Sequence, residues 1–244
     1  MGNKQFALII FLTLAAFFGW MAYDSQQTSR EVRTQQASGD VLLGVSPEAM
    51  APIQYLFHLP EPVYSHALNT QQIEQLGSAT GTGEGEHYHV YGITVADYKM
   101  DALYQFNWSK KWFKEEYGMW IENLQVDFSY NTLNVYVTSN YPEDSCEYRE
   151  TLAHENQHVE IHRRIYIEYQ KTLRNVLTHS TGIPMADHPL AFSSKEEGKE
   201  RIGKIIADVV DPVFDQFKQG MADEQAKIDT PENYAELRSR CQHW

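Results

Sequence analysis

Residues 151–164, TLAHENQHVEIHRR, hold three histidines and two glutamates. Within this stretch HENQH has the form H-E-x-x-H. On a helix, His154 and His158 lie about one turn apart on the same face, so both rings can bind one metal ion. Glu155 is offset to the side, where its carboxylate can take a proton from water activated by the metal. The spacing therefore predicts a zinc-dependent hydrolytic site with Glu155 as general base.

The helix expected to carry this motif runs from Glu150 to about Thr178. Its apolar residues recur at three- and four-residue steps, and both motif histidines fall on that stripe. Two inward-facing imidazoles without a ligand are costly to bury. This placement favours metal binding over the alternative, a solvated or internally satisfied pair of histidines.

A third protein ligand is needed. His162 lies about 12 Å beyond His154 along a straight helix, too far for one ion. A second amphipathic helix is expected over residues 194–228, kinked or restarted at Pro212. If the two helices pack antiparallel, the end of the second lies beside the motif. Glu224, on the expected inward stripe near that end, is the favoured ligand. The remaining candidates are Asp223, Asp229 and Glu168.

Two cysteines, Cys146 and Cys241, are the only ones in the chain. In an exported protein a sparse, even count favours one disulfide over two free thiols. Such a bond would hold the C-terminal tail beside the start of the motif helix, which agrees with a ligand near the end of the second helix.

The N-terminus predicts export. Lys4 precedes an 18-residue apolar run from Phe6 to Tyr23, which as a helix would span about 27 Å, close to the hydrocarbon thickness of a bilayer. No good cleavage site follows, so we expect an uncleaved membrane anchor, with a cleaved signal peptide as the alternative. The rest of the chain would then face the periplasm or the cell exterior.

The remaining sequence predicts one α+β domain. Residues 1–23 form the anchor or signal, 24–40 a polar linker and 41–244 the domain. Short helices and loops are expected over 41–76, and strands over 87–139, where aromatic and β-branched residues recur with period two. A hairpin is expected from 124–128 and 133–137 around SYNT, and a short helix over 109–118. The expected architecture is a small antiparallel sheet packed on two long antiparallel helices.

At residues 145–162, SCEYRETLAHENQHVEIH, the chain resembles the zincin metallopeptidases, and more narrowly a group of secreted bacterial zinc-dependent proteases. The resemblance extends over about 87–241 and implies a zinc site held by His154 and His158, with Glu155 as catalytic base. The metzincin pattern is absent, because no glycine follows His158 and the next histidine comes too early.

The charge of −13, without a basic cluster, argues against nucleic acid as a partner. The favoured function is an exported zinc peptidase acting on a peptide or protein substrate. The alternative is a non-enzymatic envelope protein whose metal is structural or absent. Tyr148, Arg149 and Tyr166 are further candidates for contacting a carbonyl, and His87 and His89 are expected at the surface.

Overall fold

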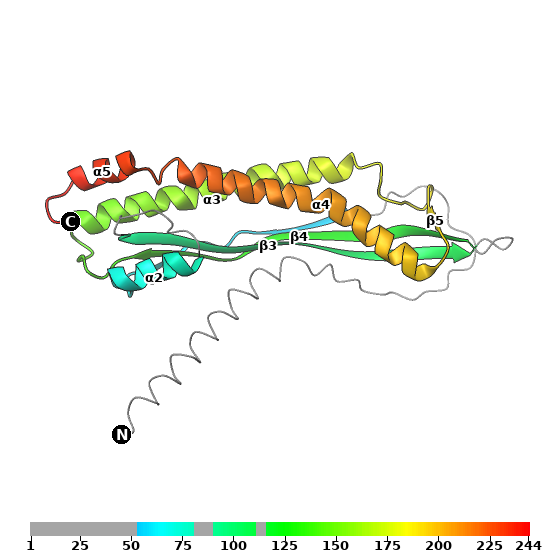
Figure 1. Ribbon diagram of the computed structural model, residues 1–244, viewed down its shortest axis with the longest axis horizontal. Helices are drawn as coiled ribbons and strands as arrows, with labels where there is room; N and C mark the ends of the chain where they lie inside the picture. The colour runs from blue at the N-terminus through cyan, green and yellow to red at the C-terminus, as the bar shows by residue number, and fades with distance from the viewer. Residues whose placement is uncertain (1–52, 81–89, 111–115) are drawn as a thin grey trace, which may run out of the picture. The chain divides into compact units, whose positions relative to one another are not determined.

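The structure, a computed structural model, describes residues 53–80, 90–110 and 116–244 (Figure 1). The apolar run 6–23, the linker 24–40, His87 and His89 lie outside the described residues. Within the described ranges, no helix has the length and apolar character needed to cross a bilayer.

Five strands form one mixed sheet around a long antiparallel pair. β3 (Gly92–Lys110) and β4 (Tyr117–Val137) pair along their whole lengths. On β4, β1 (Ile53–His58) and β2 (Val63–Ser65) pair in parallel, and β5 (Leu190–Phe192) pairs antiparallel. The α+β class is confirmed, but the expectation of a purely antiparallel sheet is wrong. The segment expected to form only short helices and loops supplies both parallel strands.

The predicted hairpin within residues 124–137 is also wrong, because both of its halves belong to β4. Thr132 pairs with Asp97 and Tyr130 pairs with Tyr98, so Asn131 is an extra residue in the ladder. This bulge shifts the side-chain alternation by one position, and residues on both sides of it keep facing the core. The hairpin partner is β3 instead. Of the helix expected over 109–118, Ser109, Lys110, Tyr117 and Gly118 are in strands, and 111–115 lie outside the described residues.

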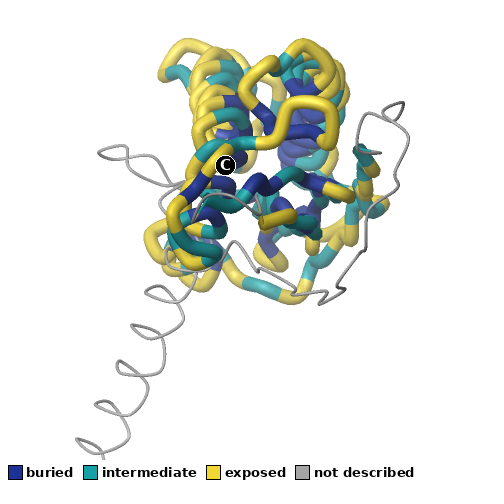
Figure 2. Tube along the Cα trace, turned by 90° about the vertical axis from the view of Figure 1, so that its right-hand side faces the viewer, coloured by how far each residue is buried: buried dark blue, intermediate teal, exposed yellow. Residues whose placement is uncertain are grey.

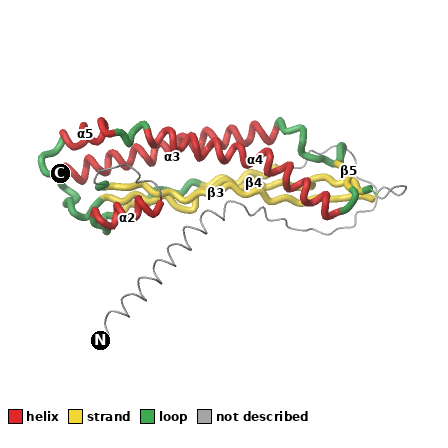
Figure 3. The backbone as a smooth tube through the Cα atoms, viewed as in Figure 1, coloured by secondary structure: helices red, strands yellow, loops and turns green. Residues whose placement is uncertain are grey.

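Two long helices cover one face of the sheet (Figures 1 and 3). α3 (Cys146–Thr178) begins at the N-cap Ser145, and α4 (Lys195–Ala226) begins at the N-cap Ser194. They run antiparallel, since His158 contacts Gln225 while Tyr169 packs on Phe217. α4 continues through Pro212 as one helix. The proline lies on the exposed side, where water can satisfy the carbonyl that it frees.

Two shorter helices complete the described fold. α5 (Pro231–Ser239) follows α4 after a short turn, and α2 (Thr70–Thr80) lies on the other side of the strands in Figure 3. α5 has no buried residue of its own. Its position must therefore depend on polar contacts and on the covalent link near the C-terminus.

The residues coloured as buried in Figure 2 gather where the long helices meet the sheet, and their hydrophobic members form one main core cluster. Within this core, the ring of Phe128 of β4 contacts both long helices. Its centroid is 4.7 Å from that of Tyr166 of α3 and 4.9 Å from that of Phe217 of α4. Burial of each such ring contributes about 1.5–3 kcal/mol. The aromatic contacts fix α4 against α3 and so place the end of α4 beside the H-E-x-x-H motif.

Candidate metal centre

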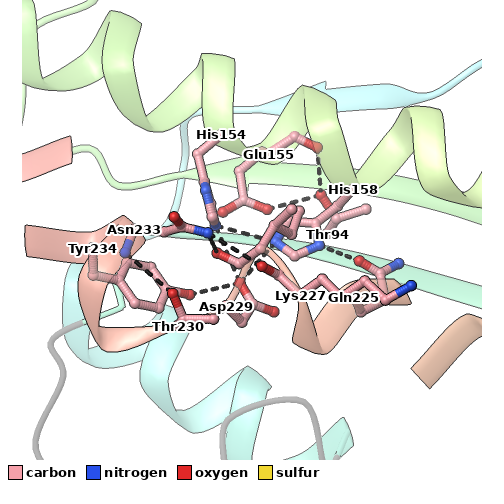
Figure 4. Close-up of polar contacts among 11 residues, drawn as sticks. Thr94, His154, Glu155, His158, Gln225, Lys227, Asp229, Thr230, Asn233 and Tyr234 are labelled. Carbon is pink, nitrogen blue, oxygen red and sulfur yellow. Dashed lines mark hydrogen bonds and ion pairs between the residues drawn. The ribbon is translucent and has the colours of Figure 1, made fainter. Parts of the chain in front are cut away.

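The two motif histidines converge at the end of α4. His154 and His158 are both buried, and their Nε2 atoms are 3.2 Å apart (Figure 4). The four-residue spacing places the rings one above the other on the face of α3 that meets α4. The two rings that the sequence brings together are therefore aimed at one point.

Asp229 supplies a carboxylate oxygen to the same point. It lies in the turn between α4 and α5, where its backbone N–H donates to the carbonyl oxygen of Gln225. Asp229 Oδ1 is 3.2 Å from His154 Nε2 and 3.1 Å from His158 Nε2. Among the described residues, these three form the only group of His, Cys, Asp or Glu side chains arranged to hold one ion.

The geometry of this trio fits a tetrahedral metal. Zinc binds nitrogen and oxygen at about 2.0–2.1 Å, so tetrahedral ligand atoms lie about 3.3 Å from one another. The three observed separations of 3.1–3.2 Å are close to that value. Structural zinc sites use four protein ligands, whereas catalytic sites use three. A trio of two histidines and one carboxylate matches the second kind.

Hydrogen bonding around His158 also favours a cation. Its Nδ1 lies against Oε1 of Gln225, an acceptor, so Nδ1 carries the proton. In neutral His158, the Nε2 lone pair then points at the Asp229 carboxylate. Nε2 and the carboxylate oxygen are both hydrogen-bond acceptors, so a proton or a metal ion must lie between them. Burial opposes the charged form of His158, but Asp229 and Glu155 outweigh it and raise its pKa to about 9. Burial also opposes ionisation of Asp229, yet the two histidines hold its pKa below the usual range.

Glu155 is in place to act as a base beside the trio. Its side chain is 3% exposed, and its Oε2 accepts a hydrogen bond of 2.8 Å from the Thr94 hydroxyl of β3. Burial raises its pKa, while the nearby His158 and His154 and the Thr94 contact lower it in part. A carboxylate with a raised pKa is a stronger base, and the Thr94 hydroxyl fixes the orientation of this one.

Gly92 lets the strand approach this carboxylate. A Cβ atom at this position would lie 2.7 Å from both Glu155 Oε1 and Thr151 Cγ2. At those separations a side chain fits only if Glu155 or Thr151 moves. At Gly92 the backbone of β3 therefore lies directly against the H-E-x-x-H segment of α3, and two residues later the Thr94 side chain bonds the same glutamate.

Tyr234 and Gln225 are site residues that sequence reasoning missed. The Tyr234 hydroxyl of α5 donates a 2.8 Å hydrogen bond to Asp229 Oδ1, and its ring centroid is 5.3 Å from that of His154. Burial and the Asp229 charge raise the Tyr234 pKa, so the phenol stays protonated and remains a donor. Tyr234 lies only five residues after Asp229, but no periodic pattern in the sequence predicts that Tyr234 or Asp229 faces the histidines.

Glu224, the expected third ligand, does not lie beside the histidines, and Asp229, one of the other candidates, takes that position. The Glu224 carboxylate pairs with Lys227 and, at 2.7 Å, with Arg164, and these contacts lower its pKa. The inward stripe of α4 passes through Phe217, Met221 and Gln225 instead. Each residue turns a helix by about 100°, so an error of one position moves a side chain off the core face. Asp223, another candidate, bonds Gln219 at the surface.

His162 is buried but lies outside the trio. Its Nδ1 is 3.0 Å from the Tyr130 hydroxyl, and burial, with the charge of His158, lowers its pKa to about 4. The expectation that it is not a ligand agrees with this geometry. Two of the three carbonyl-binding candidates have partners elsewhere: Tyr166 donates to backbone oxygens of the core, and Arg149 donates to the Asp144 carbonyl. The ring of the third, Tyr148, packs against His66.

The predicted Cys146–Cys241 disulfide is present, with Cα atoms 5.8 Å apart. It joins the start of α3 to the residues after α5. A 2.9 Å ion pair between Arg240 and Glu150 reinforces the same connection. The segment that carries Asp229 and Tyr234 is thus attached to α4 at one end and to the start of α3 at the other.

Comparison with known proteins gives no match to a family model, to a curated protein or to a solved structure.

Proposed function

We propose that the protein is an exported zinc-dependent hydrolase, and specifically a peptidase. The observation that supports this most is the mutual spacing of 3.1–3.2 Å among the ligand atoms of His154, His158 and Asp229. Only three such ligands meet among the described residues. That number favours a catalytic site over the structural one of the non-enzymatic alternative.

When bound at this trio, zinc would supply Lewis acidity and make water a nucleophile near neutral pH. The residues of the chain have separate roles. Glu155 accepts a proton from the attacking water and returns it to the leaving amine. The Thr94 hydroxyl fixes the orientation of the Glu155 carboxylate. Tyr234 orients Asp229, and Gln225 orients His158.

Glu155→Gln tests the catalytic assignment. The amide keeps the size of the side chain but cannot act as a base, so we expect peptide hydrolysis to fall by roughly 10²–10⁴-fold. Zinc content, measured by elemental analysis of untagged protein, should stay at the wild-type level because Glu155 is not a ligand. Hydrolysis at the wild-type rate would exclude Glu155 as the base, and zinc-free wild-type protein would exclude the metal site.

A further inference from the structure

A cavity of about 30 Å³ lies beside the metal trio, between three elements. The start of β3 contributes Gly92, α3 contributes Thr151 and Glu155, and α5 contributes Tyr234 and Leu237. His154 also lines it. Any group in this cavity would touch the proposed base and one metal ligand, so the cavity is placed to receive part of a substrate held for hydrolysis.

The cavity is small, and contacts on two sides hold its walls. A cavity of roughly 10–15 Å³ in the same measure holds one water molecule, so this space holds about two water-sized groups and suits a side chain such as a hydroxymethyl. On one side, Gly92 of β3 lies so close to α3 that an added Cβ would overlap Glu155 and Thr151. On the other side, α5 is held by the Tyr234–Asp229 hydrogen bond and by the Cys146–Cys241 disulfide after it. Widening the cavity for a larger group would strain these connections, which favours a small occupant.

Thr151 provides a second, independent indication of a ligand. Its side chain is 4% exposed, and its hydroxyl has no hydrogen-bond partner within the part of the chain that the structure describes. Buried hydroxyls are normally paired, so an unpaired one on a residue that lines this cavity, beside the proposed base, indicates a missing polar partner. A hydroxyl on the ligand would supply it.

We propose that this cavity is the specificity subsite for a residue flanking the cleaved peptide bond, and that it selects glycine, alanine or serine, with serine favoured by Thr151. The inference rests on the proposed peptidase function and names its substrate class. Each methylene that a pocket cannot accept costs roughly 10- to 200-fold in kcat/KM. A leucine or phenylalanine at this position should therefore be cleaved at least 10-fold less well than serine.

The first test uses the full-length zinc-loaded protein and otherwise identical peptides that differ at one residue on either side of the cleaved bond. Leu237→Ala enlarges the cavity and should shift the preference toward valine and leucine by roughly 10-fold or more. Glu232→Ala, on the exposed side of the same helix, should keep the wild-type profile. A wild-type protein that prefers bulky residues, or ignores size, at both flanking positions would overturn the proposal, as would an unchanged profile in Leu237→Ala.

Thr151→Val keeps the shape of the side chain and removes the hydroxyl. It should lower kcat/KM for serine by roughly 2- to 10-fold, the effect of one hydrogen bond, and leave alanine unaffected. Equal loss for serine and alanine would contradict the role of the hydroxyl.

Binding separates this inference from the peptidase proposal. Calorimetric titration of Glu155→Gln protein with the same peptides needs no turnover. If no peptide is cleaved by the wild type, the peptidase proposal fails, and the titration still tests the cavity. Tighter binding of the serine and alanine peptides than of the leucine peptide supports the subsite, whereas equal binding excludes it.

Discussion

Gly92→Ala should disable the proposed base while leaving the metal trio intact. The new Cβ would lie 2.7 Å from Glu155 Oε1 and 2.7 Å from Thr151 Cγ2. Ordinary contacts between carbon atoms are about 3.5–4.0 Å, so the overlap is about 1 Å. Thr151 is β-branched and stiff at χ1, and the neighbouring carboxylate is buried. The Glu155 side chain must therefore move by about the same distance.

A shift of 1 Å at a catalytic group can reduce the rate by roughly 10²-fold. We expect kcat for hydrolysis of a fluorogenic peptide with serine beside the cleaved bond to fall by about that factor in Gly92→Ala. The overpacking should cost about 1–3 kcal/mol of unfolding free energy, measured by denaturant titration. Zinc affinity, measured by competition with a chromophoric chelator, should change by only a few-fold.

Gly118→Ala is the matched control on β4. Its added Cβ would meet nothing closer than Ser109 Oγ at 3.4 Å, an ordinary contact distance. This variant should keep wild-type kcat and zinc affinity. A wild-type kcat in Gly92→Ala would refute the reasoning, because Glu155 would then have moved without consequence or not at all. Loss of zinc together with activity would show that the whole helix moves.

Three further outcomes follow from the geometry of the site. Asp229→Asn should weaken zinc binding by more than roughly 100-fold, whereas Glu224→Gln should change it by only a few-fold; equal effects would remove Asp229 from the trio. Replacing Cys146 and Cys241 by serine should lower the unfolding free energy by about 4.7 kcal/mol in the chain-entropy estimate for a 95-residue separation. It should also weaken zinc binding, because the segment bearing Asp229 loses its second attachment, and unchanged affinity would contradict that role. Buried His162 has a pKa of about 4 in the folded protein against 6.5 in the unfolded chain, so the unfolded state binds more protons between these values. Stability should therefore fall by about 3 kcal/mol as the pH drops from 6.5 to 4, and His162→Gln should reduce this slope in denaturant titrations at several pH values.

The hairpin error shows where local patterns stop being informative. Residues 124–128 and 133–137 both alternate as strands, and SYNT between them has turn-forming composition. Composition cannot distinguish a turn from a bulge, because both suit the same polar residues. The extended pairing of β3 with β4 decides the matter by keeping the chain straight through Asn131.

The third ligand shows a related limit. Antiparallel packing and the cysteine pair located the correct end of the second helix from sequence alone. The choice among Glu224, Asp223 and Asp229 depends on where α4 ends and on how it is rotated about its axis, and the core contacts of Phe217 and Met221 set the rotation. Asp229 lies beyond the end of the helix, where periodicity makes no prediction.

By itself the sequence determined the α+β class, the helix that carries His154, Glu155 and His158, and the single disulfide. These features depend on short-range spacing or on a count of two cysteines. The tertiary structure alone decided the carboxylate that joins the histidines, the Thr94 and Tyr234 contacts and the cavity beside Glu155. Thr94, the two histidines and Asp229 come from segments far apart in the chain, and only packing of the helices on the sheet brings them within hydrogen-bonding distance. The Tyr234–Asp229 contact is local and depends on the turn between α4 and α5.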